Sequence, residues 1–171
     1  MSRFYYVDKT EDFEVWKFEP DLVHAFPFYM ERVALPWRIR CIMEFFVGYV
    51  VYYIKKENEW AGYCVVSSGS NPRYDFSSDK DIIYGRYFIA EKFRGQHLAV
   101  KMLKKVLDNC ESNYEKAFAY LRVSNIPSVK TMEKIGATKI KQFDIKGKLR
   151  KLQDNPDGEF VLYRYMKGKI L

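Results

Sequence analysis

The sequence of 171 residues predicts an α/β (α+β) fold, a mixed β-sheet flanked by helices, in a single domain that spans residues 1–171. The order of the segments carries this prediction, because strand-like and helical stretches follow one another as β, α, β, β, β, α, β, α, β, β. The strand, helix and strand in the middle imply a right-handed crossover between parallel strands. Strand pairs toward the two ends imply antiparallel pairing, so the sheet is expected to be mixed.

The expected strands are rich in β-branched and aromatic residues, and polar turn signals separate them. A hairpin turn is expected at residues 56–59, a polar loop at 69–80, and a tight turn at the sequence NPDG of residues 155–158. The strands are expected at residues 3–7, 45–56, 58–68, 81–91, 116–125, 138–148 and 159–167.

The best-defined expected helix has apolar residues at i, i+3, i+4, i+7, i+8 and i+11, which places them on one stripe. These residues are Ala99, Met102, Leu103, Val106, Leu107 and Cys110. A shorter helix is expected over residues 126–136, with Pro127 in its first turn and Gly136 at its end. One or two short helices are expected within residues 21–40.

Composition and charge narrow the function classes. The chain has a net charge of +7 and 18% aromatic residues, but no cluster of Lys and Arg interleaved with aromatics predicts a nucleic-acid-binding module. The longest uncharged apolar run, residues 45–54, is about half of the ~20 residues that cross a bilayer, and the N-terminus lacks the apolar region of a secretion signal. Three widely spaced cysteines argue against disulfides or a zinc site and for a reducing compartment. We therefore expect a cytoplasmic protein that binds no nucleic acid, membrane or metal.

The stretch FRGQHLA, residues 93–99, is the main candidate for a binding site. It joins an expected strand to the best-defined helix, and the first N–H groups of a helix lack partners within that helix. The helix dipole adds partial positive charge there, so the turn could hold a phosphate or pyrophosphate. It could equally be an ordinary connection, with Arg94 as a brace. The stretch lacks the GxxxxGK[ST] and GxGxxG patterns, which excludes a nucleotide P-loop and a dinucleotide fingerprint.

Arg94, Gly95 and Ala99 fit the pattern R/Q-x-x-G-x-G/A after a strand, although His97 stands where a glycine is usual. The amide of His97 can still point at a phosphate if its backbone stays in the right-handed helical region, which needs no glycine. About thirty residues later a second pattern, N-x-x-A/S-x-x-x-Y-x-K-x-G-F, is also matched. Its matching residues are Asn125, Ser128, Lys134 and Gly136, with the Glu133 common in several branches. The two motifs resemble those of the GNAT acetyltransferase superfamily, and the order of elements fits that family over essentially the whole chain.

This resemblance implies a splayed sheet, in which central strands at residues 82–90 and 117–124 part at their carboxyl ends. It implies acetyl-CoA as cosubstrate and direct transfer of its acetyl group to an amine of a small molecule or a peptide, in a protein that could form a homodimer. The pyrophosphate would lie on the turn, and the pantetheine arm would pair with the strand before it. The implied cofactor-binding residues are Phe88, Ile89, Ala90, Arg94, Gly95, Gln96, His97, Leu98, Ala99, Asn125 and Ser128.

The sequence does not fix the catalytic residues. The family's usual acid is a tyrosine of the second motif, and Met132, which cannot donate a proton, stands in its place. The candidates for proton transfer are Glu91, Tyr87 and Ser128, and the thiolate could also leave unassisted. Strand alternation is expected to place Tyr84 and Tyr87 on opposite faces of the sheet. The alternatives to an enzyme are a catalytically inactive acyl-CoA-binding sensor or interaction module and, last, a basic nucleic-acid-binding domain.

Overall fold

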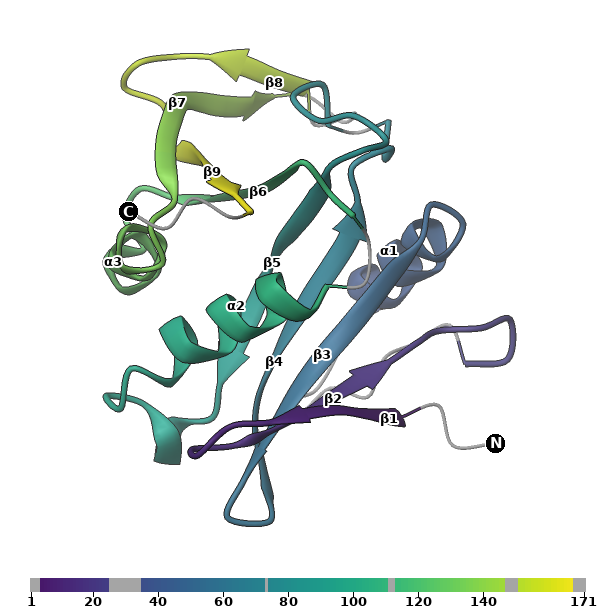
Figure 1. Ribbon diagram of the computed structural model, residues 1–171. Coiled ribbons are helices and arrows are strands. Elements are labelled where there is room, and N and C mark those ends of the chain that lie inside the picture. The colour runs from purple at the N-terminus through teal and green to yellow at the C-terminus, as the bar shows by residue number, and fades with distance from the viewer. Residues whose placement is uncertain (1–3, 25–34, 73, 111–112, 147–150, 168–171) are drawn as a thin grey trace.

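The computed structural model describes residues 4–24, 35–72, 74–110, 113–146 and 151–167. Its strands are β1 (Phe4–Lys9), β2 (Glu14–Phe18), β3 (Tyr49–Lys56), β4 (Glu59–Ser68), β5 (Ile82–Ile89), β6 (Lys116–Arg122), β7 (Thr138–Lys146), β8 (Lys151–Asp154) and β9 (Phe160–Met166). In the described part of the chain they form one nine-stranded sheet with the order β1-β2-β3-β4-β5-β6-β9-β7-β8 (Figure 1). β5 and β6 pair in parallel and the other neighbours pair antiparallel, so the predicted mixed sheet is confirmed.

Helices cover both faces of this sheet. On one face, α1 (Leu35–Phe45) buries Cys41 against the side chains of β3 and β4. On the other face lie α2 (Leu98–Asn109) and α3 (Ile126–Lys134). The apolar stripe predicted for α2 faces the core, where Met102, Leu103, Val106 and Leu107 are each 0% exposed. Burial of each such side chain favours folding by roughly 1.5–3 kcal/mol, so this stripe fixes α2 against the sheet.

The structure has two strands that were not predicted, and one helix ends later in the chain than predicted. β2 and β8 have five and four residues, too few for a strong period-two pattern in the sequence. α1 extends to Phe45, past the predicted limit at residue 40, and Gly48 ends it. The φ angle of 97° at Gly48 lets its N–H donate to the carbonyl of Glu44 at 3.0 Å, as is common after helices. Residues 25–34 of the predicted helical region lie outside the described residues.

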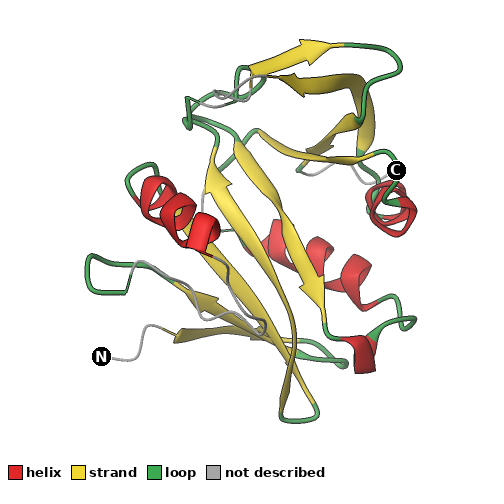
Figure 2. Cartoon of the chain, turned by 180° about the vertical axis from the view of Figure 1, so that it is seen from behind, coloured by secondary structure: helices red, strands yellow, loops and turns green. Residues whose placement is uncertain are grey.

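The sheet splits between its two parallel strands. β5 and β6 are paired only at Ile82 with Ala117 and at Ile83 with Phe118. Beyond these pairs β5 continues beside β4, and β6 continues beside β9. Seen from behind in Figure 2, the strands accordingly diverge into two groups. The expected splay is therefore confirmed, and it leaves one edge of β5 without a strand partner among the described residues from Tyr84 onward.

A bulge in β5 changes which side chains face the split. Cys64 of β4 is opposite Tyr87, and its neighbour Val65 is opposite Gly85, so Arg86 is an extra residue. Arg86 has a φ angle of 46°, in the left-handed region. The expectation that Tyr84 and Tyr87 lie on opposite faces is wrong, because the extra residue resets the alternation. Both tyrosines pack on the α2 side.

Among the described helices, none combines the length and apolar character needed to cross a membrane.

Candidate active site

The turn from β5 into α2 contains two residues in the left-handed region. A short 3₁₀ helix, Glu91–Phe93, leads into Gly95 with a φ angle of 79° and His97 with a φ angle of 55°. α2 then begins at Leu98. His97 therefore does not meet the condition of a right-handed backbone: it is the residue before the helix, where the chain reverses. Histidine is among the non-glycine residues enriched in this conformation, which explains how it replaces a glycine here.

Side chains from three elements surround this turn. Nε of Arg94 donates to the carbonyl oxygen of Ile89 at 3.1 Å, so Arg94 braces the turn. Nζ of Lys56, at the end of β3, donates to the side-chain oxygen of Gln96 at 2.8 Å. Nζ of Lys134, at the end of α3, lies 3.3 Å from Nδ1 of His97. Two lysine charges therefore stand beside the first amides of α2, where an anion would be stabilised.

These two lysines were not among the predicted site residues. Lys134 belongs to the second motif, and its place in that motif could have identified it. Lys56 carried no such signal, because only the tertiary structure brings the β3–β4 hairpin to the turn. Leu98 was predicted, but its side chain is 3% exposed in the core, so only its backbone can contact a ligand.

The open edge of β5 presents backbone groups to the split. The N–H of Ala90 donates to the carbonyl of Ala61 at 2.9 Å, so Ala90 is bonded to the β4 side. Because antiparallel strands alternate between bonded and non-bonded pairs, Phe88 is also bonded toward β4, whereas Ile89 is not. The N–H and carbonyl of Ile89 therefore point away from β4, toward the split. Of the three predicted residues Phe88, Ile89 and Ala90, Ile89 is the one placed to pair with a ligand backbone.

Tyr87 faces α3 across the split. Its hydroxyl is buried and forms no well-aligned hydrogen bond with the described residues. Loss of hydration raises the pKa of Tyr87, and the nearby hydroxyls of Ser128 and Thr131 on α3 offset only part of this rise. The hydroxyl of Thr131 is itself committed, since it donates to the carbonyl of Pro127 at 2.8 Å. Tyr87 therefore remains protonated at neutral pH and lies close to Ser128.

The remaining predicted residues have simpler roles in the fold. The side chain of Asn125 accepts a hydrogen bond from the N–H of Ser128 at 3.3 Å and so caps α3, as Asn commonly does. Glu91 is exposed at the first residue of the 3₁₀ helix. Met132 is 0% exposed and belongs to the core between α3 and the sheet.

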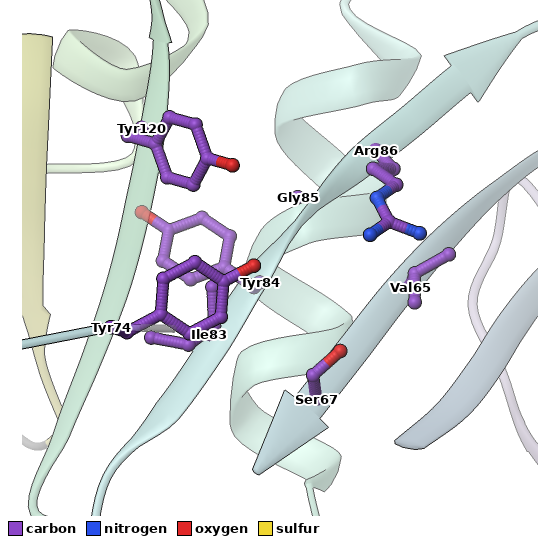
Figure 3. A pocket seen from close by; sticks show the side chains of 8 residues that line it. All are labelled: Val65, Ser67, Tyr74, Ile83, Tyr84, Gly85, Arg86 and Tyr120. Atoms are coloured by element: carbon purple, nitrogen blue, oxygen red, sulfur yellow. The ribbon is translucent and has the colours of Figure 1, made fainter. Parts of the chain in front are cut away.

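A cavity of about 280 Å³ lies on the α1 side of the split (Figure 3). Arg86, at the bulge, forms an ion pair with Glu44 of α1 beside it. Figure 3 shows the phenol oxygens of Tyr74 and Tyr120 pointing toward β5. The residues that line the cavity are Val65, Ser67, Tyr74, Ile83, Tyr84, Gly85, Arg86 and Tyr120.

This geometry can be compared with known proteins. The sequence profile described as the acetyltransferase (GNAT) family matches residues 9–137. The chain belongs to the GNAT acetyltransferase family. A search of curated proteins found no match. The predicted family, its fold and the predicted enzyme class, an acetyltransferase, are thus confirmed.

Solved structures of GNAT acetyltransferases share this fold at low sequence identity. RimL, a ribosomal L7/L12 alpha-N-protein acetyltransferase in complex with coenzyme A, is 15% identical with a TM-score of 0.61, and the match covers 95% of this chain and 98% of RimL. Spermidine N-acetyltransferase from Vibrio cholerae, in complex with CoA and spermine, is 12% identical with a TM-score of 0.54 over 71% of this chain and 67% of that one. An acetyltransferase from Thermus thermophilus is 15% identical with a TM-score of 0.56, covering 80% of this chain and 77% of that one.

The described residues contain no group of three or more His, Cys, Asp or Glu side chains that could hold a metal ion.

Proposed function

We propose that this protein transfers the acetyl group of acetyl-CoA to a primary amine. The observation that carries the proposal is the split between β5 and β6, which opens beside the first turn of α2. One crevice thus combines two binding features. The open strand edge suits the amides of the pantetheine arm, and the basic start of the helix suits the phosphates. RimL and the V. cholerae spermidine N-acetyltransferase, which share the fold, are both solved with CoA.

The turn of residues 94–99 fits a pyrophosphate. The first N–H groups of α2 and the charges of Lys56 and Lys134 would bind it, while Arg94 holds the turn in shape. A side chain added at Gly95 would meet no protein atom within 4 Å, so the space above this residue is open to a ligand. The N–H of Ile89 would bind the pantetheine arm along the open edge of β5, since the carbonyl of Ile89 already accepts from Arg94.

Acetyl-CoA supplies a thioester, whose acyl carbon accepts the amine. The amine nitrogen forms a bond to that carbon, the carbon–sulfur bond breaks, and the products are an amide and a thiol. A backbone N–H at the open edge of β5 would stabilise the negative charge that develops on the carbonyl oxygen. The amine must be neutral to attack, and its surplus proton passes to water.

Tyr87 is placed to supply the proton that the departing thiolate takes up. Its raised pKa keeps the phenol protonated, and its buried hydroxyl lies in the split. Ser128 stands close enough to orient this hydroxyl, and water afterwards restores the proton to Tyr87. Glu91, by contrast, is exposed at the start of the 3₁₀ helix and would contribute less.

The reaction is proposed to take place in the cytoplasm. Cys41, Cys64 and Cys110 are buried thiols, as is usual for proteins of reducing compartments.

Two measurements test the proposal. Acetyl-CoA should raise the melting temperature, and thiol release should be detected with at least one amine of a broad panel. Tyr87→Phe should lower kcat about 100-fold, the low end for a general acid, without changing the KM for acetyl-CoA. Tyr114→Phe is the matched control, since its buried hydroxyl donates to the carbonyl of Leu107, away from the split.

Each negative result of these measurements would contradict a different part of the proposal. No stabilisation by acetyl-CoA would refute the proposal as a whole. Stabilisation without thiol release from any amine would instead favour a catalytically inactive acyl-CoA-binding module. A normal kcat for Tyr87→Phe would remove Tyr87 from the mechanism while leaving acetyl transfer intact.

A further inference from the structure

The cavity beside Arg86 is placed to receive the amine. It ends at Gly85 and Arg86, in the bulge of β5, whereas the next residue, Tyr87, faces the α2 side. A ligand that lies in the split can therefore be reached both from the cavity, on the α1 face of the sheet, and from Tyr87, on the α2 face. An amine in the cavity would approach the thioester from the face opposite α2.

Arg86 places a guanidinium in the wall of this cavity. Among the described lining residues it is the one with a basic side chain. Its guanidinium pairs with Glu44, and the two side chains are 21% and 6% exposed. Glu44 itself is not among the residues that line the cavity. Figure 3 shows the guanidinium on the same side of the cavity as the hydroxyl of Ser67.

The opposite wall is built of aromatic rings and one aliphatic side chain, with the two phenol hydroxyls at its edge. The rings of Tyr74 and Tyr120 lie 6.0 Å apart between centroids, and Ile83 continues this wall. The volume of about 280 Å³ is at the lower limit of small-molecule sites, which typically measure ~300–1,000 Å³. The cavity thus suits a small molecule with an apolar body.

From these features we propose that the acceptor is a small amine that carries a carboxylate on an apolar body, such as an aromatic or branched α-amino acid. The guanidinium of Arg86 binds the carboxylate, for which its planar fork of N–H donors is suited. The proposal rests on the acetyltransferase function proposed above. A polyamine would instead bring several positive charges to Arg86, with no acidic group among the described lining residues to receive them.

The test compares acceptors that differ only in the carboxylate. Phenylalanine and leucine are each compared with their carboxamides, and spermidine represents the polyamines. We expect kcat/KM for the acids to exceed that for the amides by about 10- to 100-fold, the range for a charge-assisted hydrogen bond. In Arg86→Asn this preference should disappear. Asn tolerates the left-handed conformation of residue 86, so the bulge is retained.

The control and a second measurement separate this inference from the proposed function. Arg122→Asn removes an arginine that pairs with Glu159 outside the cavity and should keep the preference. Binding of phenylalanine and phenylalaninamide to the CoA-saturated protein, measured by calorimetry, gives the same comparison without turnover. Equal binding of the two, or a preference for spermidine, would overturn the inference even if acetyl transfer is observed. Tighter binding of the acid, lost in Arg86→Asn, would support it.

Discussion

The hydroxyl of Tyr84 donates a hydrogen bond to the sulfur of Met132, and the two atoms are 3.4 Å apart. Met132 occupies the position at which the GNAT motif usually has a tyrosine, and it is fully buried. Burial raises the pKa of Tyr84, so this phenol stays a donor at neutral pH. The contact joins α3 to β5, and Met132 belongs to the core.

Substitutions of Met132 should therefore change stability and leave the reaction intact. Met132→Leu conserves volume and should change the free energy of unfolding by less than about 1.5 kcal/mol, with normal thiol release. Met132→Ala should lower that free energy by about 2–5 kcal/mol through the cavity it leaves. Urea denaturation and the acetyl-transfer rate check both variants. A stable Met132→Leu protein without activity would show that Met132 acts in the reaction.

Gly95→Val should abolish the stabilisation by acetyl-CoA. The φ angle of 79° makes valine strained there by about 1–2 kcal/mol, and its side chain would fill the open space above the turn. Gly48→Val is the matched control, because Gly48 also has a positive φ angle and no protein atom within 4 Å of an added side chain. Both variants should melt earlier without ligand, but only Gly48→Val should respond to acetyl-CoA. An equal response of the two would place the phosphates elsewhere.

Lys134→Gln should weaken acetyl-CoA binding about 2- to 5-fold, because an exposed lysine beside a phosphate contributes modestly. Lys56→Gln should have a similar effect, and both losses should shrink at high salt, which screens exposed charges. Lys104→Gln, an exposed residue farther along α2, is the control and should bind normally. Calorimetric titrations at low and high salt measure the affinity of each variant for acetyl-CoA. Wild-type affinity in Lys134→Gln would exclude this residue from the phosphate site.

Stability should fall with rising pH above about 9. Burial raises the pKa of Cys64 from 9.0 to about 12, so the folded protein holds a proton that the unfolded chain releases. This contribution is fully present below pH 9.0 and is lost progressively toward pH 12, at up to about 1.4 kcal/mol per pH unit. Buried Tyr84, whose pKa is also raised, acts in the same direction above pH 10.

Urea denaturation at pH 8, 9 and 10 checks this dependence. Cys64→Ala should be less stable at every pH, because it loses buried volume, but its stability should decline less steeply between pH 9 and 10. Parallel curves for the two proteins would mean that the thiol is not the group that titrates.

Much of the site followed from the sequence because it depends on local order along the chain. FRGQHLA between a strand and an apolar stripe places the turn at the start of α2, whatever the rest of the fold. Asn125 and Pro127 likewise set the start of α3. Local signals of this kind act within a few residues, so they can be read without knowing the tertiary contacts.

The bulge at Arg86 could not be predicted from local sequence signals. Its sequence, YGRYF, alternates plausibly as a regular strand, and only pairing with β4 shows that one residue is extra. That residue turns Tyr87 to the α2 side and places Arg86 beside Glu44, 42 positions away in the chain. The hydrogen bond between Tyr84 and Met132 spans 48 positions and was equally hidden.

The sequence by itself thus determined the order of the elements, the turn that starts α2 and membership of the GNAT fold class, since periodicity, capping and turn residues act locally. The tertiary structure decided which face of the sheet Tyr84 and Tyr87 occupy, which lysines lie beside the turn, and that Arg86 lines the cavity. Those outcomes depend on strand register, and a shift of register by one residue exchanges the two faces of a strand.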